Sequence, residues 1–236
     1  QVGKTTYVTK QLQGRKHVYA SADTPTPPNV EFIMEHWNKA RQLSGLEKFL
    51  VLDEVQKIPR WSEVVKSLWD EDIRLGNKLN VWLLGSSALL MEKGLSESLT
   101  GRFELNRFPH WTFQECKKIF GASLEEYIEY GGYPKAYSFR DDRERWINYL
   151  QDSIVETTLG RDILTLHSVD KPALLRQLFW YVSRLPAHII SYEKILGNLQ
   201  GKGNSATLVH YAELLKLAFI VLPISKFSPT AHRIKR

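Results

Sequence analysis

The chain has 236 residues, of which 43% are hydrophobic and 25% are charged, a composition typical of a folded protein of one to two domains. Its single cysteine, Cys116, excludes an internal disulfide framework and fits the cytoplasm, where we expect the protein to lie. No apolar run approaches the roughly 20 residues of a membrane-spanning helix, so we expect no membrane partner, and a formal net charge of +6 permits nucleic-acid binding without requiring it.

The chain opens on Gln1-Val2-Gly3-Lys4-Thr5-Thr6, which matches the end of the phosphate-binding pattern G-x-x-x-x-G-K-[ST]. We assign Gly3, Lys4, Thr5 and Thr6 to nucleotide binding, at the start of a helix expected over residues 5–13. The opening glycine of the pattern and the strand before it would precede Gln1. Without them we expect these 236 residues to bind ATP weakly or not at all, whereas the complete gene product would bind it. A G-K-T tripeptide also arises by chance as a solvated turn. Whether these residues form a nucleotide site therefore depends on the later segments.

A strand over 16–20, a proline-rich connector and a helix over 30–43 lead to Phe49-Leu50-Val51-Leu52-Asp53-Glu54. Four apolar residues followed by two carboxylates are typical of a buried parallel strand that ends at a ligand-binding edge. We expect the Thr5 hydroxyl to bind Mg²⁺ directly and Asp53 to hold it through water. Glu54 is placed to activate a water molecule as general base. The alternative for Asp53 is an N-cap of the next helix.

After a helix expected over 61–72, a second apolar run ends in Gly85-Ser86-Ser87. Ser86 or Ser87 is a candidate to contact the γ-phosphate or to orient the attacking water, and the sequence does not choose between them. The alternative is a turn and N-cap that lead into the following helix.

The segment Leu99-Thr100-Gly101-Arg102-Phe103-Glu104-Leu105 is typical of a helix end, a glycine, an arginine and then a strand. An arginine before the last strand could reach the γ-phosphate of a neighbouring subunit, where its permanent charge would stabilise the transition state. This role of Arg102 requires a homo-oligomer. The alternative is a structural arginine paired with Glu97 or Glu104.

The second half is expected to be helical over 113–120, 123–130, 142–158 and 171–184. A further helix begins at Ser191, and a helix over 205–217 precedes an extended segment at 219–224. This order is typical of a winged helix-turn-helix that binds DNA through the 205–217 helix. That helix carries Ser205, Thr207 and His210 but is poor in arginine, which weakens the prediction of base reading.

The ordered segments GKTT, FLVLDEVQKIP, LLGSS, LTGRFEL and RFPHWTFQE resemble a family of bacterial and archaeal AAA+-type P-loop ATPases with a C-terminal winged-helix domain of unknown function. EYGGYPKAY and SIVETTLGRDI fit the same family, in which Arg161 is a candidate second arginine near the nucleotide; its alternative is an ion pair, for example with Glu156. The resemblance implies an α/β fold, with a P-loop NTPase parallel sheet and flanking helices, then a helical region and a winged helix-turn-helix. It implies a P-loop core over 1–120, a helical lid or linker over 121–165 and a truncated winged-helix-like part over 166–236.

The expected function is therefore ATP binding and Mg²⁺-dependent hydrolysis by an AAA+-type ATPase whose client the sequence does not identify. The alternative is a nucleotide-regulated DNA-binding winged-helix module without significant turnover. The expected catalytic residues are Glu54, Arg102 and Ser86 or Ser87; nucleotide contacts are assigned to Gly3, Lys4, Thr5 and Thr6, and metal contacts to Thr5 and Asp53.

Overall fold

The computed structural model describes residues 2–26, 28–85, 98–164, 169–199 and 203–225, with the side chains of Arg161 and Asp162 excepted. The chain divides into two compact units, Gln1–Gln151 and Asp152–Arg236. No helix in the described ranges is long and apolar enough to cross a membrane.

A parallel sheet forms the centre of the first unit, with its strands in the order β1-β2-β3. The strands span His17–Ser21 (β1), Phe49–Asp53 (β2) and Asn80–Leu83 (β3). Strand β2 is central and buried along its whole length, as its apolar run predicts. Ser21 pairs with Asp53 in the parallel register, so β1 and β2 end at the same edge of the sheet. The parallel α/β part of the predicted fold is confirmed.

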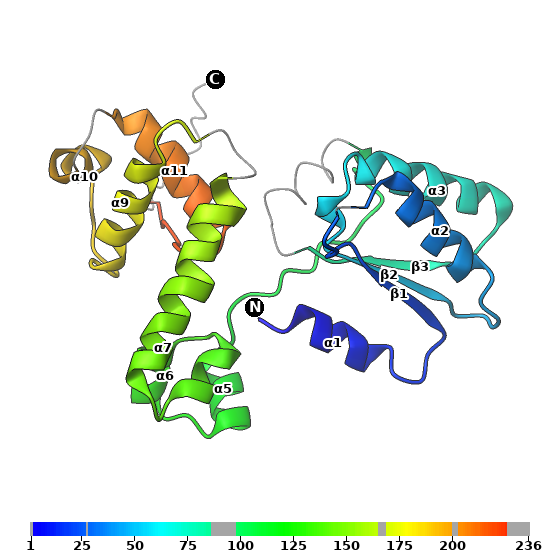
Figure 1. Cartoon of the computed structure of the whole chain (residues 1–236), viewed down its shortest axis with the longest axis horizontal. Coiled ribbons are helices and arrows are strands. Elements are labelled where there is room, and N and C mark those ends of the chain that lie inside the picture. Colours follow the sequence, from blue (N-terminus) through cyan, green and yellow to red (C-terminus); the bar gives the residue numbers. More distant parts are fainter. Residues whose placement is uncertain (1, 27, 86–97, 165–168, 200–202, 226–236) are drawn as a thin grey trace. The chain divides into compact units, whose positions relative to one another are not determined.

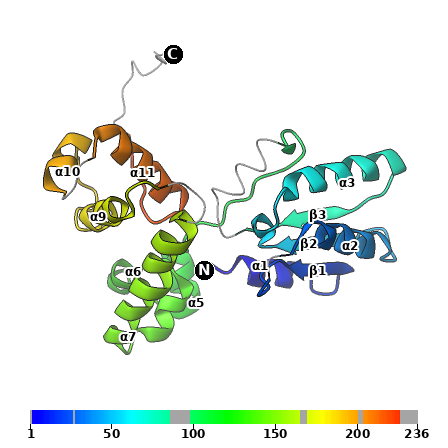
Figure 2. The ribbon, with the colours of Figure 1, turned by 45° about the horizontal axis from the view of Figure 1, so that its top comes forward.

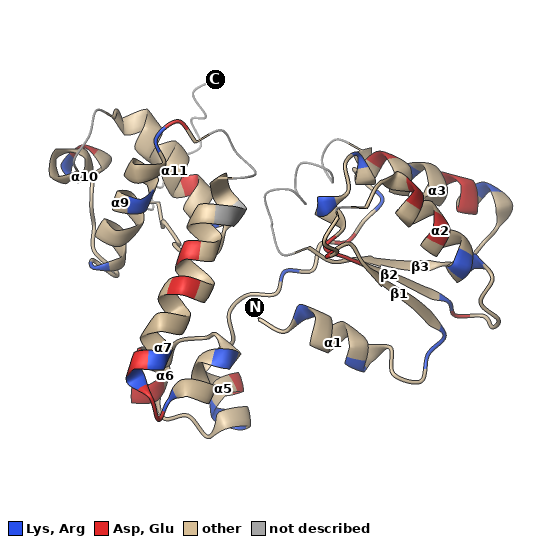
Figure 3. Ribbon diagram, in the orientation of Figure 1, with Lys and Arg blue, Asp and Glu red and all other residues tan. Residues whose placement is uncertain are grey.

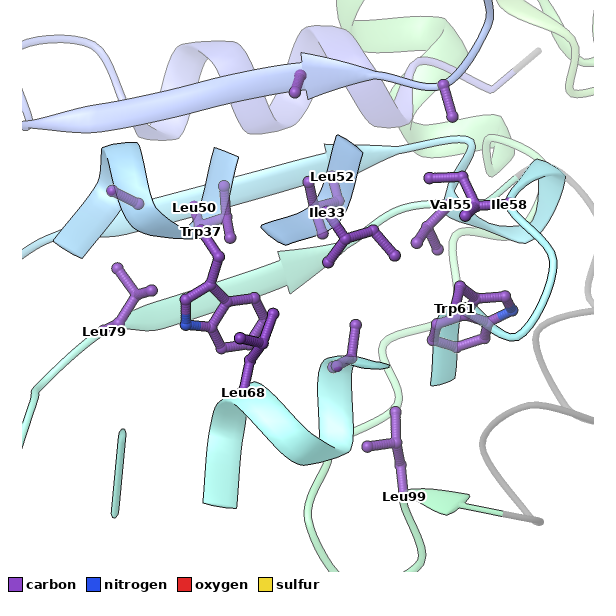
Figure 4. Close-up of a cluster of buried hydrophobic side chains, with 14 residues drawn as sticks. Ile33, Trp37, Leu50, Leu52, Val55, Ile58, Trp61, Leu68, Leu79 and Leu99 are labelled. Carbon is purple, nitrogen blue, oxygen red and sulfur yellow. The ribbon is translucent and has the colours of Figure 1, made fainter. Parts of the chain in front are cut away.

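Helices cover both faces of this sheet (Figure 1). Val8 of α1 and Leu12, the C-cap of this helix, pack against Phe49 and Val51 on one face. On the opposite face, Figure 4 shows the larger cluster that α2 and α3 form with Leu50 and Leu52. The alternation of side chains along β2 thus serves two separate cores. The helices span Lys4–Gln11 (α1), Val30–Arg41 (α2) and Trp61–Leu75 (α3).

A buried carboxylate joins α2 to α3. Asp72 is only 2% exposed. It accepts hydrogen bonds from Trp37 Nε1 at 2.7 Å, Arg41 Nε at 2.8 Å and Asn77 Nδ2 at 3.0 Å. An indole, a guanidinium and an amide therefore compensate the charge that this interface buries.

The segment after Arg102 departs from its prediction. Residues 103–110 are described and contain no strand, so the strand expected there is wrong. Neither edge strand of the described sheet pairs with this segment. Its backbone N–H and C=O groups lack the neighbouring ladder that a strand requires, and Phe103 and Leu105 are exposed.

Helices α5 (Phe113–Phe120), α6 (Leu124–Tyr130) and α7 (Arg143–Asn148) follow in the first unit. Thr112 with Glu115, and Ser123 with Glu126, form capping boxes that start α5 and α6. The two helices enclose an aromatic cluster, which we call the α5–α6 cluster. Its buried members are Cys116, Ala122 and Tyr137, and Trp111, Phe120, Tyr127 and Tyr130 pack against them.

Trp111 fixes this cluster to the turn that follows α6. The Trp111 N–H donates to the Gly132 carbonyl at 2.9 Å, and the Tyr127 hydroxyl donates to the Trp111 carbonyl at 2.9 Å. A Cβ at position 132 would lie 2.5 Å from the Trp111 oxygen. This close approach of two backbones explains why a glycine occupies position 132. The turn continues into a 3₁₀-helix, Pro134–Phe139.

The helix predicted over 142–158 is helical in the structure but not α-helical throughout. Asp142 caps α7 by accepting from the Arg145 N–H at 3.1 Å. Two stretches of π-helix follow, Tyr149–Glu156 and Thr158–Ile163, and the border between the compact units falls in the first of them. The predicted division at residues 120 and 165 stays a prediction.

Three helices of the second unit, α9 (Pro172–Ser183), α10 (Tyr192–Asn198) and α11 (Ser205–Leu217), lie side by side (Figure 2). Ser191 and Asn204 cap α10 and α11 through their side chains, as the sequence predicts for Ser191. Residues 218–225 are described and contain no strand. The winged helix-turn-helix therefore stays a prediction, of which the structure describes the helices.

Candidate nucleotide site

The phosphate-binding sequence lies at the start of α1. Gly3 adopts a left-handed conformation, with φ 89° and ψ 22°, and no side chain caps the helix. A positive φ favours glycine, so Gly3 turns the chain into the helix at low cost. Lys4, Thr5 and Thr6 occupy the first turn, where helix N–H groups and the helix dipole favour a negative charge.

The Asp53 carboxylate lies at the end of β2 and is only 7% exposed. Its Oδ2 accepts from Thr5 Oγ1 at 2.9 Å and from the Tyr19 hydroxyl at 2.5 Å. Its Oδ1 accepts from the Glu54 N–H at 2.9 Å. The fold thus brings the two residues expected at the metal, Thr5 and Asp53, into direct contact. An N-cap role for Asp53 is not observed, because Glu54 occupies that position before the next short helix, Val55–Lys57.

Lys4 reaches the neighbouring strand end. Its Nζ donates to the Gly85 carbonyl, two residues beyond β3. Ser86 and Ser87 lie outside the described residues, and their assignment stays a prediction. The Lys4 contact nevertheless connects the start of α1 to the residue immediately before them.

Glu54 has an unusual backbone conformation for a glutamate, with φ 53° and ψ 34°. The left-handed region costs a non-glycine residue roughly 1–2 kcal/mol. The Glu54 Oε2 accepts from Gln56 Nε2 at 2.6 Å. The turn between β2 and the short helix therefore directs the backbone N–H of Glu54 toward Asp53, while Gln56 holds its carboxylate.

Tyr19 is a member of this site that the sequence analysis missed. It lies on β1, where it pairs with Val51, two residues before the Ser21–Asp53 pair. Side chains two residues apart on a strand share a face, so Tyr19 and Asp53 lie on the same face of the sheet. Partial burial and the hydrogen bond to Asp53 raise the pKa of Tyr19 to about 12. The hydroxyl therefore stays neutral, as a donor, at physiological pH.

Arg102 has a partner that neither sequence-based alternative named. Its Nε lies 3.0 Å from Oδ1 of Asp70 on α3. Both side chains are partly exposed, so the ion pair contributes little stability. Glu156, the partner suggested for Arg161, contacts Arg176 at 3.0 Å. The Arg161 side chain lies outside the description, so its pairing stays a prediction.

A second missed feature links the chain after Arg102 to the phosphate-binding sequence. The Trp111 indole Nε1 donates to the Val2 carbonyl at 3.0 Å, and the ring of Phe108 packs edge-on against Tyr7 at 5.2 Å. The aromatic segment FPHW is visible in the sequence, but no local pattern indicates that it contacts residues 2–7.

The oxygen atoms at this site suit a hard divalent cation. Mg²⁺ takes hydroxyl, carboxylate and water oxygens, and it binds proteins through few direct ligands. Thr5 donates its proton to Asp53, which leaves lone pairs of Oγ1 for a metal. Among the described residues, no group of three or more His, Cys, Asp and Glu side chains could hold a metal ion. The donor set fits Mg²⁺ bound mainly by water and nucleotide.

Comparisons with known families divide the chain into two parts. Residues 1–117 match a family described as an AAA domain. Residues 121–236 match a family described as "Domain of unknown function (DUF8612)".

Curated relatives cover the chain more widely. The uncharacterized protein MJ1544 of Methanocaldococcus jannaschii is 24% identical in an alignment 200 residues long, which covers 77% of this chain and 44% of the relative. The uncharacterized protein Rv2008c of Mycobacterium tuberculosis is 25% identical over 223 residues, which are 94% of this chain and 47% of the relative. The chain thus spans about half the length of the curated relatives that it matches.

Among solved structures, the chain is similar to the Orc1 protein of Aeropyrum pernix in complex with DNA. The identity is 16%, the TM-score is 0.37, and the match covers 92% of this chain and 75% of that one. A likeness at this score supports no further conclusion. The family match to residues 1–117, read with the geometry at Gly3, Thr5 and Asp53, supports an AAA-type, P-loop ATPase-like domain with a nucleotide-binding function in the first half of the chain.

Proposed function

We propose that this chain carries the nucleotide site of a Mg²⁺-dependent, AAA+-type ATPase. The observation that carries the proposal is the 2.9 Å contact between the Thr5 hydroxyl and the Asp53 carboxylate. It joins the uncapped start of α1, whose first turn favours phosphate, to the end of the buried central strand.

The binding residues have distinct roles in this proposal. Lys4 neutralises charge on the β- and γ-phosphates, and the first-turn N–H groups of α1 cradle them. Thr5 binds Mg²⁺ through Oγ1, and Asp53 holds the Thr5 proton and the water shell of the metal. When bound, Mg²⁺ withdraws electron density from the phosphate oxygens.

Glu54 is the proposed general base, and Gln56 sets the position of its carboxylate. Ser86 or Ser87 contacts the γ-phosphate in this scheme. Arg102 acts on a neighbouring subunit's nucleotide, and for this it has to exchange Asp70 for phosphate oxygens. Its partial exposure and weak surface pairing allow such an exchange.

The proposal is tested by ATP binding and turnover in the natural-length protein, with Lys4→Ala and Glu54→Gln compared with wild type. Lys4→Ala is expected to weaken ATP binding by more than about tenfold, since it removes a charge-assisted contact. Glu54→Gln is expected to lower turnover by about 100-fold or more while ATP stays bound. Lys10→Ala is the matched control, because Lys10 is an exposed lysine in the last turn of the same helix.

Two results would contradict this proposal. One is a wild-type protein that binds no ATP in the presence of Mg²⁺. The other is wild-type turnover in Glu54→Gln, which would remove Glu54 from the chemistry and leave only a nucleotide-binding role.

A DNA-binding module is the second candidate, and the packing of α10 and α11 in the second unit favours it. However, Figure 3 and the sequence show few charged positions on α11. Its exposed residues are Ala206, Val209, His210 and Glu213. Phosphate contacts require positive charge, so this face is poorly suited to enter a DNA groove. Lys226 and Arg233 belong to the basic stretch at the end of the sequence, and reversing their charges tests this candidate. If the chain binds DNA through that stretch, the double variant should bind a DNA duplex more weakly and with a smaller salt dependence.

A further inference from the structure

We infer that Tyr19 is the positioning residue that holds the Asp53 carboxylate ready for Mg²⁺. The inference rests on the proposed ATPase function and assigns a role to a side chain that lies outside the phosphate-binding and acidic motifs. It starts from the short contact between the Tyr19 hydroxyl and Asp53 Oδ2, at 2.5 Å.

Three donors from three segments fix the Asp53 carboxylate. Oδ2 accepts from Tyr19 on β1 and from Thr5 on α1, and Oδ1 accepts from the Glu54 backbone N–H. A carboxylate has about four lone-pair positions, so these donors leave one for a further partner such as a metal-bound water. Loss of Tyr19 would leave Oδ2 with the Thr5 hydroxyl alone, and the carboxylate could then rotate.

The hydroxyl of Tyr19, rather than its ring, explains why a tyrosine occupies position 19. The side chain is 40% exposed and belongs to neither hydrophobic cluster of the sheet, so the ring contributes little to the core. Tyr19 lies beside Val51, two residues before Asp53, and its long side chain extends from there to the end of β2. A shorter polar side chain at the same position would not reach Asp53.

A tyrosine also leaves the charge of Asp53 intact. A lysine or arginine at position 19 would form an ion pair and neutralise the carboxylate, whereas a neutral hydroxyl orients it without doing so. The result is a fixed, negative oxygen pair beside the Thr5 hydroxyl. This is the arrangement that a divalent cation with a water shell requires.

The experiment is a MgCl₂ titration of Tyr19→Phe and wild type in the natural-length protein. The readout is the fluorescence anisotropy of ATP that carries a methylanthraniloyl label. Tyr19→Phe is expected to raise the half-saturating Mg²⁺ concentration by about tenfold, the usual effect of removing a hydrogen bond to a charged group. Labelled-ATP affinity in EDTA is expected to match wild type, because it does not depend on the metal.

Tyr7→Phe is the matched control. It removes the hydroxyl of a similarly exposed tyrosine, whose ring packs against Phe108 instead of reaching Asp53. Its Mg²⁺ titration is expected to follow wild type.

The outcomes separate this inference from the function on which it rests. An unchanged or lower half-saturating Mg²⁺ concentration in Tyr19→Phe, beside a Mg²⁺-dependent wild type, would overturn the role of Tyr19 alone. An equal loss of affinity with and without Mg²⁺ would do the same, since it would indicate a structural role. A wild-type protein without any Mg²⁺ effect would overturn the proposed ATPase and this inference with it.

Discussion

The first unit buries two carboxylates, Asp53 at the end of β2 and Asp72 between α2 and α3, in opposite ways. Asp72 receives a guanidinium, an indole and an amide, so a cation neutralises its charge. Asp53 receives two hydroxyls and one backbone N–H, and its described contacts include no ion pair. Both are satisfied by hydrogen bonds, but only Asp72 is compensated in charge.

Under the proposed function, this difference separates a structural carboxylate, Asp72, from the carboxylate that we propose for the metal, Asp53. Removing an ion from water costs several kcal/mol unless an opposite charge offsets the lost hydration. At Asp72 the guanidinium of Arg41 is that opposite charge. At Asp53 the missing positive charge is the one that a divalent cation would supply. Burial alone does not reveal the distinction; the chemistry of the donors does.

The largest expected effect is at the α2–α3 interface. Asp72→Asn leaves Arg41 without its nearest buried anion, so we expect the free energy of unfolding to fall by about 3 kcal/mol. Urea unfolding monitored by circular dichroism measures this change. ATP affinity of the variant is expected to stay at the wild-type value at temperatures where it is folded.

Asp70→Asn is the control for that variant, because Asp70 pairs with Arg102 in a partly exposed position. Its cost is expected to stay below about 1 kcal/mol. If the two variants destabilised the protein equally, Asp72 would not be the buried structural carboxylate described above.

The intermediate effect is at the sheet edge. We expect Asp53→Asn to change the free energy of unfolding by less than about 1 kcal/mol, because the hydroxyls of Thr5 and Tyr19 can accept as well as donate. The same variant is expected to abolish the Mg²⁺ dependence of ATP binding. Parallel urea unfolding and Mg²⁺ titrations measure the two properties, and a loss of stability as large as that of Asp72→Asn would remove the contrast.

The smallest effect is a dependence on high pH. The pKa of Tyr19 in the folded protein, about 12, lies above its ordinary value of 10.0, so folding holds the proton more tightly. The stability that Tyr19 contributes is complete below pH 10 and is lost as the pH rises from 10 to 12. The difference in stability between wild type and Tyr19→Phe should therefore shrink across that range. A constant difference would show that the hydroxyl does not titrate against Asp53.

Local sequence predicted much of this fold. The apolar run 49–52 predicted a buried central strand, and helix 205–217 has the predicted bounds because Asn204 caps it and its buried residues recur at helical spacing. The motifs also indicated that Thr5 and Asp53 belong to one site, which the structure brings together. These features depend on neighbouring residues or on a motif of fixed geometry.

Contacts that depend on tertiary packing could not be predicted in the same way. Tyr19 reaches Asp53 through the register of two parallel strands, and Arg102 finds Asp70 on a helix 32 residues earlier. The strand expected after Arg102 failed because strand propensity does not supply a neighbouring strand. Alternation of side chains along β1 could have drawn attention to Tyr19, once the register was known.

The α5–α6 cluster has a consequence for how this protein can be divided. The two family matches meet between residues 117 and 121, inside α5 and next to Cys116, which packs against Ala122 and Tyr137. A gene cut at that border would separate side chains that share one hydrophobic cluster and would part Trp111 from Gly132. The border between the two family matches is therefore not a structural boundary in the folded chain. Residues up to at least Tyr137 belong with the part that matches the AAA domain when the chain is divided.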